Sequence, residues 1–126
     1  MSLTKKFDEA LATYKKHGWR LVRVLARPET LEALRAGDDA AATYEGAPVS
    51  ESDVDALWFT RPSQGGREAW ELRLIAEPPY ALFELFEPDE EEEDREDVRR
   101  EMEARLREYT SPREVSGEPR GEKASE

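Results

Sequence analysis

The chain has 126 residues, a length typical of one domain, and it carries a net charge of −11 at pH 7. It contains no cysteine, which excludes disulfide bonds, thiol chemistry and thiolate zinc sites. The acidic balance disfavours tight binding to nucleic acid or to anionic membranes, because both carry negative charge. The sequence has no apolar run of the about 20 residues needed to span a membrane, and no secretory signal, so we expect a cytoplasmic protein. Its excess of arginine over lysine is typical of a GC-rich bacterial genome.

An amphipathic helix is predicted over residues 4–17. Lysines occupy one side of this helix, and the apolar side comprises Leu3, Phe7, Ala10, Leu11 and Tyr14. Gly18 suits the left-handed conformation that ends a helix. A strand rich in β-branched and aromatic residues is predicted next at Trp19–Ala26, followed by a short peripheral helix at Pro28–Ala36.

Residues 38–55 carry the weakest pattern of the chain. Ala40–Tyr44 has the composition of a short strand, whereas Gly46–Pro48 is expected to interrupt regular structure. Asp53 and Asp55 stand beside serines, which is typical of a turn.

Three consecutive strands are predicted at Ala56–Thr60, Arg67–Ala76 and Tyr80–Phe86, because each run of alternating residues is bounded by glycine or proline. They would form a β-meander. The strand Tyr80–Phe86 is apolar on both faces, so we expect it to be covered on both sides. The second cover could be a helix, a sheet that closes on itself, or a partner subunit.

A long charged helix is predicted at Asp89–Tyr109, where acidic residues precede basic ones and the apolar stripe is thin. The predicted fold is α+β: an antiparallel β-meander sheet packed with an N-terminal amphipathic helix and this C-terminal helix. We expect a compact core over residues 1–88. The helix at 89–109 would dock on that core or bind a partner, and residues 110–126 would form a disordered tail.

No catalytic, metal or cofactor motif is recognised. His17 is the one histidine, and its place at a helix end favours a surface role. Asp53 and Asp55 could hold a cation or act as an acid and base pair, but turn chemistry is the favoured interpretation.

Aromatic residues on the strands indicate a protein-binding surface, which we predict to comprise Trp58, Phe59, Arg61, Phe83 and Leu85. Alternation places Trp58 and Phe59 on opposite faces, so one of them needs a second partner. On this hypothesis, Trp58→Ala or Phe59→Ala would weaken partner binding without unfolding the domain.

The sequence is compatible with three functions. The leading one is a non-catalytic protein-interaction module, such as an adaptor, inhibitor or immunity-like protein, that binds another protein or itself. The first alternative is a small-ligand-binding or weakly catalytic domain, with a pocket between the first helix and the sheet lined by Trp70, Asp53 and Asp55. The second is a nucleic-acid-associated protein that uses the basic N-terminal face.

Overall fold

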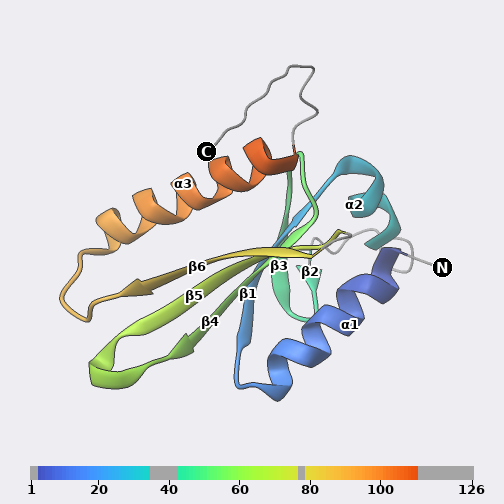
Figure 1. The fold of residues 1–126 in the computed structure, drawn as a ribbon. Coiled ribbons are helices and arrows are strands. Elements are labelled where there is room, and N and C mark those ends of the chain that lie inside the picture. The colour runs from blue at the N-terminus through green and yellow to red at the C-terminus, as the bar shows by residue number, and fades with distance from the viewer. Residues whose placement is uncertain (1–2, 35–42, 77–78, 111–126) are drawn as a thin grey trace, which may run out of the picture.

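The computed structural model describes residues 3–34, 43–76 and 79–110, and six strands within them form one sheet (Figure 1). The strand order is β2-β3-β1-β4-β5-β6. The strands are β1 (Arg20–Ala26), β2 (Thr43–Tyr44), β3 (Ala47–Glu51), β4 (Ala56–Pro62), β5 (Glu68–Leu74) and β6 (Tyr80–Phe86). The helices are α1 (Leu3–Lys16), α2 (Pro28–Leu34) and α3 (Glu92–Thr110).

The α+β class is confirmed, and the predicted meander is present as the antiparallel strands β4, β5 and β6. The sheet is mixed, however, because β3 pairs with β1 in parallel. The physical reason is the β2–β3 hairpin, which reverses the chain after β2, so that β3 runs in the same direction as β1. The remaining neighbours, β1 with β4 and β2 with β3, are antiparallel.

Gly46–Pro48 was expected to interrupt regular structure, but Ala47 and Pro48 are the first two residues of β3 (Ala47–Glu51). Glu45 and Gly46 both adopt positive φ, at 51° and 86°, so they form the two-residue turn of a β2–β3 hairpin. Pro48 pairs with Thr43 near the start of β3, before the segment that pairs with β1. The proline therefore lies where a missing N–H is tolerated.

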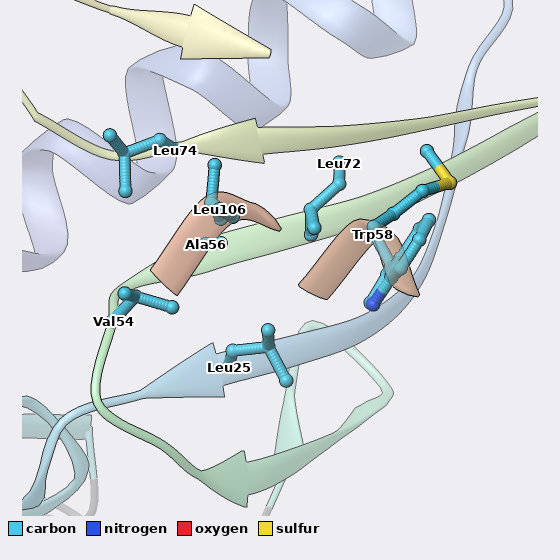
Figure 2. Packing of buried hydrophobic residues seen from close by; sticks show 8 residues of the cluster. Leu25, Val54, Ala56, Trp58, Leu72, Leu74 and Leu106 are labelled. Atoms are coloured by element: carbon cyan, nitrogen blue, oxygen red, sulfur yellow. The ribbon is translucent and has the colours of Figure 1, made fainter. Parts of the chain in front are cut away.

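The helices α1 and α3 lie on opposite faces of the sheet, called here the α1 face and the α3 face (Figure 1). On the α1 face, Phe7 and Leu11 pack with Leu57 and Phe59. On the α3 face, buried side chains from β1, β4 and β5 form one cluster with Leu106 of α3, as Figure 2 shows for Leu25, Ala56, Trp58, Leu72 and Leu74. The molecule thus has three layers, with the sheet in the middle.

The C-terminal helix begins three residues later than predicted. The backbone N–H of Glu90 donates to Glu87 O at 3.2 Å, and the Glu87 N–H donates to the Glu90 side chain at 2.7 Å. These bonds hold a turn, and the helix therefore begins only after it, at Glu92. Its Met102 and Leu106 are fully buried against the sheet. The predicted division at residues 88 and 109 stays a prediction, and the predicted tail lies outside the described residues.

The strand β4 corrects the predicted interaction surface. Trp58 is 2% exposed and lies in the core of the α3 face, and Phe59 is 0% exposed and lies in the core of the α1 face. Neither needs a partner molecule, because each of the two faces of β4 has its own helix.

We expect Trp58→Ala and Phe59→Ala to unfold or severely destabilise the protein, by about 3–5 kcal/mol each, because each leaves a large cavity. Phe83→Ala is the matched control, since that side chain is 57% exposed, and it should cost less than about 1 kcal/mol. Urea denaturation of the three variants checks this. Similar losses in all three would contradict the assignment of Trp58 and Phe59 to the core.

Candidate functional site

The α1 face of the sheet is covered over β1 and β4 but not over β6. The side chains of Ala81, Phe83 and Leu85 point to this face and are exposed, with Phe83 57% and Leu85 36% accessible. The opposite side chains of β6 point to the α3 face, where Leu82 joins the core and Phe86 is buried. One face of the edge strand is therefore apolar and open.

The strand register brings Arg61 to this same open area. Arg61 pairs with Ala69, and Ala69 pairs with Leu85, so Arg61 and Leu85 lie on one row of the sheet. The Arg61 guanidinium lies over the Trp19 ring at 4.6 Å, and its Nη1 donates to His17 O.

Trp19 completes the apolar area. Its ring meets Phe83 edge to face, with the two centroids 6.5 Å apart. An open hollow of about 560 Å³ lies beside these side chains, lined in part by His17, Pro62 and Ser63. We call the set Trp19, Arg61, Ala81, Phe83 and Leu85 the β6 patch.

Three of the five residues predicted for the interaction surface, Arg61, Phe83 and Leu85, therefore lie together, and Trp58 and Phe59 do not. The prediction missed Trp19 and Ala81 as members of the surface. The alternation of Tyr80–Phe86 already placed Ala81 beside Phe83 and Leu85. Trp19 had no such signal, because its position depends on the pairing of β1 with β4.

Next to the β6 patch, the α1 face of β5 carries a polar side chain that has a hydrogen-bond partner. The Tyr14 hydroxyl of α1 donates to the Glu71 carboxylate of β5, and Glu71 pairs with Phe83 in the sheet. Burial, and next the hydrogen bond to Glu71, raise the pKa of Tyr14 above that of a free tyrosine. The Tyr44 hydroxyl donates to Asp8 in the same way, and burial raises the pKa of Tyr44 as well.

The predicted pocket residues do not come together. Trp70 lines a hollow of about 240 Å³ under α3, where the Arg99 guanidinium lies 4.5 Å from its ring centroid and Trp58 Nε1 donates to Glu103 at 2.7 Å. A hollow of about 330 Å³ does separate α1 from β5, but its lining is Lys6, Glu9, Ala10, Thr13, Tyr14, Arg73, Ile75 and Ala76. Asp53, Asp55 and Trp70 therefore do not form one pocket between the first helix and the sheet.

Asp55 is a structural residue. Its buried carboxylate accepts the Arg27 backbone N–H at 2.9 Å, the Thr30 hydroxyl at 2.9 Å and the Arg27 Nε at 3.2 Å. These bonds fasten the start of α2 to the start of β4. Asp53 is exposed and takes no part in them.

The basic residues of the N-terminal segment are divided between the two faces. Lys6 lines the hollow beside α1, whereas Arg23 lines the hollow under α3. Arg27 is engaged by Asp55 and by Glu29, at 3.1 Å each.

No family model matches the chain, and comparisons with curated proteins and with solved structures return no match. Among the described helices, none combines the length and hydropathy needed to cross a membrane. Within the described ranges, no group of three or more His, Cys, Asp or Glu side chains is arranged to hold a metal ion.

Asp55→Ala should lower the free energy of unfolding by roughly 1–3 kcal/mol, because it leaves the buried Thr30 hydroxyl and the Arg27 N–H without their acceptor. Asp53→Ala removes a carboxylate from an exposed position two residues away, and it should change stability by less than about 0.5 kcal/mol. Chemical denaturation checks both. Equal effects of the two substitutions would contradict the structural role of Asp55.

Alkaline pH should destabilise the protein in part through Tyr14. A tyrosine whose folded pKa exceeds its unfolded value of about 10 contributes stability that is present below that pH and is lost as the pH rises through the folded pKa. The urea midpoint should therefore fall as the pH rises above about 10, and the midpoint of Tyr14→Phe should fall less steeply. A variant midpoint that falls as steeply as that of the wild type would contradict this.

Proposed function

We propose that this protein is a non-catalytic protein-interaction module and that the β6 patch is its contact surface. The observation that carries the proposal is the apolar side of β6, whose Phe83 and Leu85 side chains remain exposed on a face that α1 covers only in part. An adaptor, an inhibitor and an immunity-like protein all act through a surface of this kind.

The composition of the β6 patch supports the proposal. Protein interfaces are enriched in aromatic residues and arginine, and their energetic centres combine an aromatic anchor with a supporting rim. Phe83 is such an anchor, and Trp19 supports it through an edge-to-face contact. Arg61 is held in place by Trp19 and by the His17 carbonyl, so little side-chain freedom would be lost when a partner binds.

The edge of the sheet adds a second kind of contact. In the part of the chain that the structure describes, β6 pairs with β5 alone, so alternate residues of its backbone present unpaired N–H and C=O groups. The opposite edge strand, β2, has two residues, which is too short to template another strand. The β6 edge has seven residues and contains neither proline nor lysine, the residues that commonly block such pairing.

The test compares three tagged proteins as baits in a native lysate: the wild type, Phe83→Glu and Ala12→Glu. The control introduces the same charge at an exposed alanine of α1 outside the β6 patch. We expect a protein that the wild type and Ala12→Glu retain to be lost with Phe83→Glu. Titration of that purified protein should show binding at least about tenfold weaker for Phe83→Glu.

Capture that is the same for Phe83→Glu and the wild type would refute the β6 patch as the contact surface. Absence of any stoichiometric protein, including a second copy of the bait, would refute the interaction module itself.

A further inference from the structure

The edge strand β6 can pair with a copy of itself without opposing like charges. In an antiparallel two-fold arrangement centred on Phe83, Phe83 faces its own copy, and Ala81 faces Leu85 of the second copy. Glu84 is the one charged residue of the strand, and it would face Leu82. A centre one residue further along would instead oppose two Glu84 carboxylates, which is destabilising.

The side chains on the open face favour the same centre. Phe83 is the most exposed of the strand's large apolar residues, and the two-fold axis would place it against an identical ring. Cross-strand aromatic pairs stabilise antiparallel sheets, and the exposed Leu85 would cover Ala81 of the other copy. The apolar surface that a monomer leaves in water is thus the surface that this pairing buries.

We propose that the protein forms a symmetric dimer in which β6 strands from two copies pair antiparallel around Phe83 and join the two sheets into one. The inference rests on the proposed function, since it names a second copy of this chain as the occupant of the β6 patch.

A charge exchange at position 83 tests the symmetry axis. Sedimentation velocity is measured over a concentration series at about 0.15 M salt, where repulsion between the two acidic chains is screened beyond about 8 Å. We expect a monomer–dimer equilibrium for the wild type. Phe83→Glu and Phe83→Lys should each be monomeric, because each opposes like charges at the axis. An equimolar mixture of the two variants should dimerise again.

This recovery is specific, because only a residue on the axis faces its own copy. Circular dichroism of each variant checks that it is folded, and we expect it to be, because Phe83 is exposed. A wild type that stays monomeric at every concentration, or a mixture that stays as monomeric as its components, overturns the proposal.

Disulfide cross-linking gives a second readout. Because the chain has no cysteine of its own, only the introduced cysteine can form a disulfide. Phe83→Cys should form an intermolecular disulfide rapidly under mild oxidation, since side chains directly opposite have Cβ atoms about 4.5–5.5 Å apart. Ala81→Cys is the matched control. Its two copies would lie about 13 Å apart along the strands, so it should cross-link slowly. Equal rates for the two variants overturn the Phe83-centred register.

Failure of this dimer can be told apart from failure of the proposed function. A monomeric wild type whose capture of a different protein depends on Phe83 rejects self-pairing and keeps the interaction module. A monomeric wild type that captures nothing rejects both.

Discussion

The strand β4 carries buried side chains on both of its faces, and this alternation dictates the layers around it. Leu57 and Phe59 point to the α1 face, whereas Ala56 and Trp58 point to the α3 face. The large side chains among them, Leu57, Trp58 and Phe59, each contribute roughly 1.5–3 kcal/mol of transfer free energy when they are removed from water. A central strand of this kind therefore requires a cover on each side, and here the amphipathic α1 and the thin apolar stripe of α3 supply it.

The same constraint explains why β6 remains half covered. A helix has an overall diameter of about 10–12 Å, and neighbouring strands are about 4.8 Å apart, so one helix covers two to three strands. On its face, α1 packs on β1 and β4, and Tyr14 reaches as far as Glu71 of β5. No helix is left for the far edge among the described residues. The apolar side chains of Ala81, Phe83 and Leu85 thus remain exposed. They lie on an edge strand, which pairs on one side only among the described residues.

Local patterns in the sequence predicted β6 to the residue, and α1, β1 and β5 to within a few residues, because alternation and helical spacing are properties of neighbouring residues. The strand β3 was missed because Pro48 and Ser50 give it a weak β-pattern, and its place depends on pairing with β1. The parallel crossover likewise is a tertiary feature that no local pattern encodes.

The candidate site shows the same division between local and non-local information. Phe83 and Leu85 were predicted as surface residues because a strand apolar on both faces requires two covers, and both are exposed. Trp58 and Phe59 were misassigned because the sequence could not show that α3 docks on the sheet and covers one of them. Asp55 gave a signal of a turn but not of its buried contacts with Arg27 and Thr30, which lie 28 and 25 residues away.

Amide hydrogen exchange across β6, measured at low and at high protein concentration, tests the central claim most directly. Unpaired edge amides exchange quickly, and pairing with another strand protects them. We predict that exchange within residues 80–86 slows as the concentration rises, while exchange in α1 stays the same. Exchange in β6 that is independent of concentration would contradict self-pairing at this edge. If it also stayed unchanged when a captured protein was added, β6 would not be the contact surface.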